Sequence, residues 1–142
     1  MYVITGASGN TGGVVAETLL AHGKEVRALG RSADHLKAIE EKGAEIYTLD
    51  VNDTRKLTDA FRGAEGVYLM IPPYMGAENW MAYMDRITDS YVEALEESKV
   101  PYVVFLSSIG AQHSKGTGPI KAVHHGEKKL EALDGINTLA LR

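Results

Sequence analysis

Two kinds of segment alternate from one end of this 142-residue chain to the other. Short apolar runs rich in Val, Ile, Leu and Tyr lie at Met1–Thr5, Glu25–Leu29, Glu45–Leu49, Gly66–Ile71, Tyr102–Leu106 and Asn137–Leu141. Continuous apolar runs are typical of strands covered on both faces. Helical patterns fill the intervals, at Thr11–His22, Ser32–Lys42, Asp53–Arg62, about Glu78–Ser98 and about Pro119–Leu133. This alternation predicts an α/β fold, a doubly wound parallel Rossmann sheet of about six strands in the order 3-2-1-4-5-6, with helices on both faces.

Local signals mark the ends of these helices. Gly23, Gly43 and Gly63 follow the first three helical patterns, where a helix end favours a left-handed residue. Ser32 and Asp53 precede the second and third patterns and are predicted N-caps.

Size and composition restrict the classes of function. With 142 residues, of which 44% are hydrophobic, the chain is one domain with a core of its own. The formal charge of -4 and the lack of basic clusters argue against nucleic acid or an anionic membrane as a partner. The chain contains no cysteine and no apolar run near the roughly 20 residues of a membrane span, and its polar start is unlike a signal peptide. We expect a cytoplasmic protein.

The sequence TGASGNTG directly follows the first predicted strand and opens the first predicted helix. A helix N-terminus carries free N–H groups and a partial positive charge, so a diphosphate binds there. Gly6 permits a tight turn, Gly9 lets the backbone approach the phosphates, and Gly12 lets helix and strand pack closely. Between them lie further candidate cofactor ligands, Ala7, Ser8, Asn10 and Thr11. The alternative, a glycine-rich turn without a ligand, fits this strand–turn–helix context poorly.

The end of the second strand indicates which dinucleotide binds. A carboxylate there would bind the ribose hydroxyl of NAD, whereas an arginine accepts the 2'-phosphate of NADP. The sequence reads VRALGRS, with Arg31 followed by Ser32 and no carboxylate. A guanidinium matches a phosphate in charge and shape. NADP(H) is therefore favoured, while Asp34 nearby leaves NAD(H) possible and an arginine that only solvates the loop is the alternative.

Two other strand ends would meet at the same edge of the sheet. Asp50 and Val51 follow the third strand, and a carboxylate there either accepts the adenine amino group or forms an Asx turn or helix cap. Ile71 and Pro72 follow the fourth strand, where prolines stiffen the backbone beside the cofactor. Tyr74 and Met75 then line a substrate entrance or are simply exposed loop residues.

Candidates for the chemistry follow the fifth strand. Ser107 and Ser108 end that strand, level with the expected nicotinamide, and His124 and Lys128 lie four apart on the last helix. Imidazole exchanges protons near neutral pH, so His124 is the candidate general acid, against the alternative of an ordinary surface histidine. A metal site is not expected, because no carboxylate or thiol lies near these histidines at a ligand-like spacing.

These motifs together resemble the NmrA-like branch of the atypical short-chain dehydrogenases, and within it the type 2 NADPH-dependent quinone oxidoreductases. The resemblance covers the whole chain and rests on ITGASGNTGG, VRALGRS, the aspartate of YTLDVND, VVFLSSIGA and HHGEKKLEALDGINTLALR. It implies a phosphate loop at Gly6–Gly12, an NADP-selecting Arg31, an adenine-side Asp50 and His124 near the nicotinamide. The Tyr-x-x-x-Lys pair of typical short-chain dehydrogenases is missing from the last helix.

Relatives in this family continue past the sixth strand into a smaller lobe that covers the substrate. Residues 1–142 are therefore expected to be the NAD(P)-binding Rossmann domain of a longer family member, without the usual C-terminal substrate lobe, or to receive that cover from a homodimer or another protein partner. The expected function is an oxidoreductase that reduces quinones or similar small carbonyl compounds by hydride transfer. The alternatives are an NADP(H)-sensing regulator without turnover and, less favoured, a sugar-nucleotide epimerase, which would need the missing tyrosine.

Overall fold

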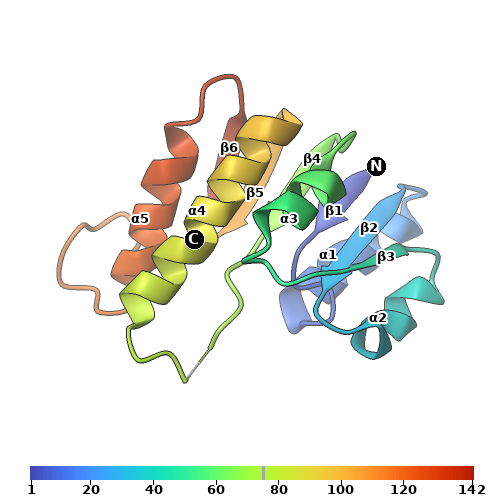
Figure 1. The fold of residues 1–142 in the computed structure, drawn as a ribbon, viewed down its shortest axis with the longest axis horizontal. Coiled ribbons are helices and arrows are strands. Elements are labelled where there is room, and N and C mark those ends of the chain that lie inside the picture. Colours follow the sequence, from blue (N-terminus) through green and yellow to red (C-terminus); the bar gives the residue numbers. More distant parts are fainter. Residues whose placement is uncertain (75) are drawn as a thin grey trace.

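The computed structural model describes residues 1–74 and 76–142. In the described residues six strands form one sheet, and their bounds are β1 (Tyr2–Ile4), β2 (Val26–Gly30), β3 (Glu45–Thr48), β4 (Gly66–Leu69), β5 (Tyr102–Leu106) and β6 (Asn137–Leu141). All neighbouring strands pair in parallel, in the order β3-β2-β1-β4-β5-β6 (Figure 1). The predicted fold class and strand order are confirmed.

Five helices connect the strands in the part of the chain that the structure describes, and their bounds are α1 (Asn10–Ala21), α2 (Ala33–Glu40), α3 (Thr54–Phe61), α4 (Trp80–Ser98) and α5 (Ile120–Glu131). Gly23, Gly43 and Gly63 all have the positive φ that was expected of them at the helix ends. Asp53 caps α3 by accepting from the Lys56 amide at 3.1 Å, as predicted. Ser32 occupies the N-cap position of α2, as predicted, with extended backbone, but its side chain makes no capping hydrogen bond.

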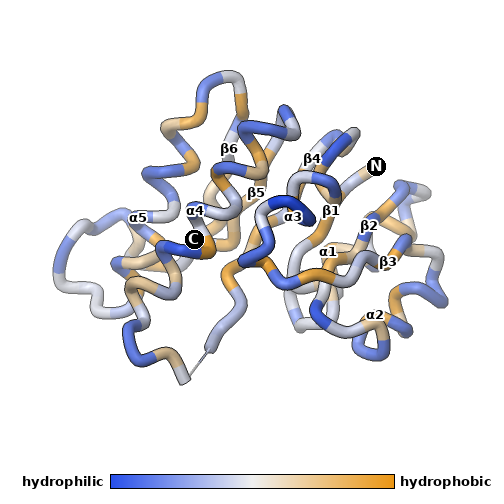
Figure 2. Tube along the Cα trace, viewed as in Figure 1, coloured by the Kyte–Doolittle hydropathy of each residue, from blue (hydrophilic) through white to orange (hydrophobic). Residues whose placement is uncertain are grey.

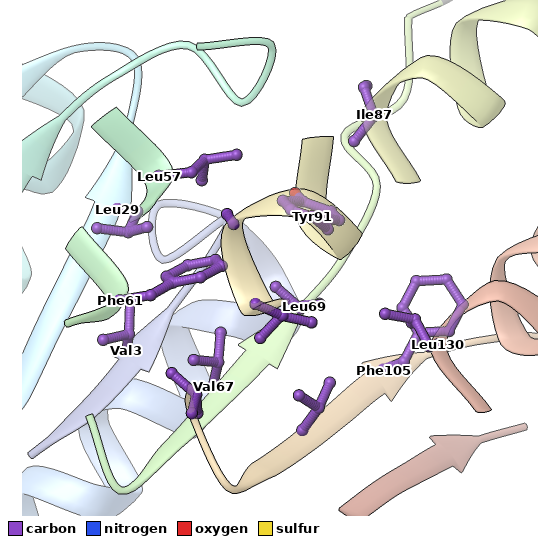
Figure 3. Packing of buried hydrophobic residues seen from close by; sticks show 14 of the residues in the cluster. Val3, Leu29, Leu57, Phe61, Val67, Leu69, Ile87, Tyr91, Phe105 and Leu130 are labelled. Atoms are coloured by element: carbon purple, nitrogen blue, oxygen red, sulfur yellow. The ribbon is translucent and has the colours of Figure 1, made fainter. Parts of the chain in front are cut away.

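The hydrophobic core is divided by the sheet into two layers. Helices α3, α4 and α5 pack over one face, where the helix residues Phe61, Tyr91 and Leu130 and the strand residues Val3, Leu69 and Phe105 belong to one buried cluster (Figure 3). Helices α1 and α2 cover the β1–β2 part of the other face, where Ile4, Ala28 and Leu36 are buried. Hydropathy follows this arrangement: apolar residues follow the strands and polar residues the outer sides of the helices (Figure 2).

The second face is only partly covered in the described part of the chain. Val104 and Leu106 of β5 lie on the α1 side, and their register partners Leu139 and Leu141 of β6 point the same way. Leu139 is 57% exposed and Tyr102 is 60% exposed. An apolar groove of about 440 Å³ lies between these strands and α1. Helices thus lie on both faces of the sheet, as predicted, but they cover the two faces unequally.

Candidate functional site

A cleft opens at the carboxyl edge of the sheet, where the chain leaves β1 toward β2 on one side and β4 lies on the other. In a doubly wound sheet this reversal of strand order creates the crevice in which ligands bind. The loops after β1 to β4 and one residue of α4 line the cleft, namely Thr5, Gly6, Ser8, Leu29, Gly30, Arg31, Leu49, Val51, Met70, Pro72 and Tyr91. The structure therefore gathers residues from four strand ends that lie far apart in the sequence.

The glycine loop after β1 has the geometry that its spacing predicts. Gly6 has a φ of +63°, in the left-handed region that glycine adopts without strain. A side chain at Gly12 would place its Cβ 2.4 Å from the Gly6 carbonyl oxygen and 2.9 Å from that of Thr5. Only glycine fits at Gly12, because both contacts are with backbone. The start of α1 is thereby held directly against the end of β1.

The first turn of α1 leaves backbone donors free beside this loop. The Gly13 amide donates to the Gly9 carbonyl at 2.9 Å, which is the first bond within the helix. The amides of Asn10, Thr11 and Gly12 precede it and have no intrahelical acceptor. Gly9 supplies no capping side chain. Free N–H groups at the positive end of a helix, next to a loop without side-chain bulk, fit the diphosphate of a dinucleotide.

The floor of the cleft is a set of satisfied hydrogen bonds between β1, β4 and α4. The Thr5 hydroxyl donates to the Tyr68 carbonyl at 3.1 Å and accepts from the Met70 amide at 2.8 Å. The Tyr91 hydroxyl donates to the Met70 carbonyl at 2.8 Å. Burial raises the pKa of Tyr91, so its hydroxyl keeps its proton in the physiological range. Tyr91 therefore supports the floor and is unsuited to exchanging a proton.

Arg31 and Asp50 lie on the β2–β3 side of the cleft. The Asp50 carboxylate accepts from the Asn52 amide at 2.8 Å and from the Asn52 side chain at 2.7 Å, both through Oδ1. These two bonds, the backbone one foremost, lower the pKa of Asp50 against the opposing effect of burial, and the nearby Arg31 and Arg86 guanidinium groups lower it further. Asp50 thus forms the Asx turn that was one of its two predicted roles, and its carboxylate is ionised at neutral pH.

The remaining residues predicted at the cofactor site fall into two groups. Val51 and Pro72 line the cleft, whereas Ala7 and Ile71 are buried in the core beneath it. Tyr74 is exposed beside Tyr83, with 5.7 Å between the ring centroids, and Met75 lies outside the described residues. The Tyr83 hydroxyl donates to the Pro72 carbonyl at 2.6 Å and holds the loop after β4 in place.

A buried carboxylate that the sequence analysis missed lies behind Ser107. The Glu127 side chain is fully buried and accepts from the Ser107 hydroxyl. Arg142 binds the same carboxylate in two places, from Nε at 3.0 Å and from Nη2 at 2.7 Å. The hydrogen bond from Arg142, followed by that from Ser107, lowers the pKa of Glu127 even though burial opposes the shift. Its position between Val123 and Leu130, on the buried side of α5, was the available signal.

His124 and Lys128 do not act as a pair. The His124 Nδ1 lies 2.6 Å from the Ala111 carbonyl oxygen, which can only accept, so Nδ1 carries a proton. The Lys128 ammonium instead contacts the exposed Glu131 carboxylate at 2.7 Å. The half-buried His124 ring is thereby fixed in one orientation, with Nε2 as its second nitrogen. In the described residues, no cluster of three or more His, Asp or Glu side chains has the geometry to hold a metal ion, and no helix is long and apolar enough to cross a membrane.

Solved structures share this fold at low sequence identity. The NADPH-dependent quinone oxidoreductase of Escherichia coli, in complex with NADPH, superposes with a TM-score of 0.85 at 24% identity, over 100% of this chain and 48% of that one. The triphenylmethane reductase of Citrobacter sp., in complex with NADP(H), gives a TM-score of 0.83 at 20% identity, over 100% of this chain and 49% of that one. The chain therefore spans about half the length of these structures.

Sequence comparison finds a curated relative and a family. Cinnamoyl-CoA reductase 1 of Oryza sativa subsp. japonica is 33% identical over 117 residues, which are 78% of this chain and 35% of the relative. The NAD(P)H-binding family matches residues 6–133, a range that includes the glycine loop, every cleft residue except Thr5, and the whole of α5. The resemblance in the motifs is thus confirmed at the level of family and fold, and the chain belongs to the NAD(P)H-binding family.

Proposed function

We propose that this chain binds NADP(H) in preference to NAD(H), and that it serves a reductase that transfers hydride to a quinone or a similar small carbonyl compound. The observation that carries the cofactor preference is the position of Arg31. It lines the same cleft as Gly6 and Ser8, at the end of β2, where an NAD-selective site would carry a carboxylate. The exposed guanidinium is available to a 2'-phosphate.

In this proposal, each group of residues that lines the cleft binds a different part of the cofactor. The free amides of α1 bind the diphosphate, Arg31 binds the 2'-phosphate, and the Asp50 carboxylate accepts the adenine amine. The bound nicotinamide supplies the hydride, and the protein supplies orientation. His124, whose Nδ1–H is held by the Ala111 carbonyl, passes a proton from Nε2 to the reduced product when the ring is an imidazolium with protons on both nitrogens, and is left as the neutral Nδ1–H form. The similarity to reductases solved with NADPH or NADP(H) supports the class of reaction.

A regulator that senses NADP(H) is the second candidate. It is favoured by one observation: α5 carries no tyrosine four residues before a lysine, so the proton-transfer pair of typical short-chain dehydrogenases is missing. Both candidates require the same cofactor cleft, and they differ only in turnover.

Binding and turnover measurements test the proposal. We expect NADPH to bind at least tenfold more tightly than NADH in a calorimetric titration, and we expect the full-length protein to oxidise NADPH with one or more members of a quinone panel. His124→Ala should lower this turnover by about a hundredfold and leave NADPH affinity unchanged. Tight binding without turnover would favour the regulator, and equal affinity for both cofactors would refute the proposed preference.

A further inference from the structure

The ion pair between the buried Glu127 carboxylate and the exposed Arg142 guanidinium has no part in the function proposed above, although it lies against the end of β5. Glu127 is the one charged residue on the buried side of α5 in the described chain, and two residues from other elements meet it there, Ser107 after β5 and Arg142 after β6. A fully buried carboxylate is costly unless its charge is paired and its oxygens are hydrogen-bonded. The contacts that satisfy it come from two neighbouring strand ends, Ser107 after β5 and Arg142 after β6.

These contacts determine the direction of the Ser107 hydroxyl proton. The bidentate contact with Arg142 keeps Glu127 ionised, and an ionised carboxylate can only accept hydrogen bonds. The single proton of the Ser107 hydroxyl is therefore directed at Glu127. The backbone of Ser107 is also held, because its amide donates to the Leu141 carbonyl at 2.8 Å. The half-buried Ser107 oxygen therefore has lone pairs, and no proton, left for a further partner.

The strand order indicates which part of the ligand reaches Ser107. Arg31 ends β2 and the diphosphate loop ends β1, so a dinucleotide that uses both runs along the edge of the sheet from β2 toward β4. Strands lie about 4.8 Å apart, which puts the end of β5 roughly 14 Å from the end of β2, on the far side of the diphosphate. The nicotinamide is the part of the cofactor beyond the diphosphate, and the amine of its carboxamide is a hydrogen-bond donor.

We propose that Ser107 accepts a hydrogen bond from the carboxamide amine of the nicotinamide, and that Glu127, held by Arg142, is the positioning residue that makes Ser107 an acceptor. The inference rests on the proposed function, since it requires a nicotinamide cofactor in the cleft. It also assigns Ser107 a part other than proton donation: its hydroxyl proton is already engaged by a buried carboxylate and is not available to a substrate carbonyl.

A cofactor analogue separates this inference from simple cofactor binding. In 3-acetylpyridine adenine dinucleotide phosphate a methyl group replaces the carboxamide amine, and the rest of the cofactor is unchanged. We expect the wild-type chain to bind NADP⁺ about tenfold more tightly than this analogue in calorimetric titrations, the effect of one hydrogen bond. In Ser107→Ala the preference should vanish, because the acceptor is gone. Ser98→Ala, which removes a hydroxyl at the far end of α4, should keep it.

Glu127→Gln tests the positioning role. The amide oxygen still accepts from Arg142, while the amide nitrogen donates to Ser107, so the serine proton is free to turn toward the ligand. We expect the preference for NADP⁺ to fall below threefold with α5 still folded, as monitored by circular dichroism.

Each outcome decides a specific claim. The same preference in wild type and Ser107→Ala would overturn the acceptor role, and a full preference in folded Glu127→Gln would overturn the positioning role. If Glu127→Gln does not fold, the comparison of wild type with Ser107→Ala still decides the acceptor role. Failure of the wild-type chain to bind NADP⁺ at all would instead refute the proposed function, and this inference with it.

Discussion

The carboxyl edge of the sheet is built differently at its β1 end and at its β5 end. At the β1 end, the amides of α1 and the glycine loop form a backbone structure whose parts all lie between Thr5 and Gly13. At the β5 end, side-chain contacts bring together Ser107, Glu127 and Arg142 from three separate segments. The first end is thus a local structure and the second a tertiary one.

This difference determines what a substitution does at each end. A backbone site tolerates exchange of its exposed side chains but not the addition of a Cβ where two backbones touch. A side-chain site that contains a buried charge fails when a partner of that charge is removed, because the charge is left without a counterpart.

Gly12→Ala should have the largest effect. Its Cβ would lie 2.4 Å from the Gly6 carbonyl oxygen, so α1 or the loop must move. We expect a loss of about 2–4 kcal/mol in the free energy of unfolding and a loss of NADPH affinity of more than a hundredfold. Denaturant unfolding and calorimetric titration measure the two. Gly63→Ala is the matched control, because its φ of +76° is strained for alanine but its surroundings are open. It should cost about 1 kcal/mol and leave binding unchanged.

Arg31→Ala should affect affinity and not stability. The guanidinium is exposed at the cleft, so its removal leaves no buried group unpaired. We expect NADPH binding to weaken by about 1.5–3 kcal/mol, the effect of a hydrogen bond to a charged group, while NADH binding changes little. Equal losses for the two cofactors would show that another residue distinguishes them.

Glu127→Gln should change how the free energy of unfolding depends on pH, because it removes the buried carboxylate at the β5 end. The folded-state pKa of Glu127 is lowered, so its ionised form stabilises the fold above the ordinary glutamate range near pH 4.3, and this contribution is lost as the pH falls through the lowered pKa. We expect Glu127→Gln to be less stable than wild type by about 1–2 kcal/mol at pH 7, and the difference to shrink by pH 3. Urea unfolding across this range measures it. Part of the wild-type acid sensitivity should persist in the variant, because the pKa of Asp50 is also lowered.

Ser32→Ala should have the smallest effect. The Ser32 side chain makes no capping bond to α2, so its removal should leave the unfolding free energy unchanged within about 0.5 kcal/mol. If the hydroxyl assists Arg31 at the 2'-phosphate, NADPH affinity should fall about threefold. Asp53→Ala is the comparison variant, because the Asp53 side chain does cap α3. Its removal should lower the free energy of unfolding by about 1 kcal/mol.

Local patterns predicted most of the fold and the diphosphate end of the site. The six strands, their order and the glycines that end three helices all agree with the structure. Helix ends were less well predicted: Ser32 has the residue type of an N-cap but not the hydrogen bond, since the bond depends on the backbone around it. Whether the predicted residues bind the cofactor stays a prediction.

The amino-acid sequence by itself determined the strand–helix architecture and the glycine loop before α1. The architecture follows from periodicity, and the loop follows from glycines spaced within one strand, turn and helix. The tertiary structure alone decided that Asp50 forms an Asx turn with Asn52, that His124 is bound by the Ala111 carbonyl and that Glu127 lies buried between Ser107 and Arg142. Ser107, Glu127 and Arg142 belong to three elements that meet only when the parallel sheet forms. A contact between such distant residues leaves no spacing signal in one sequence.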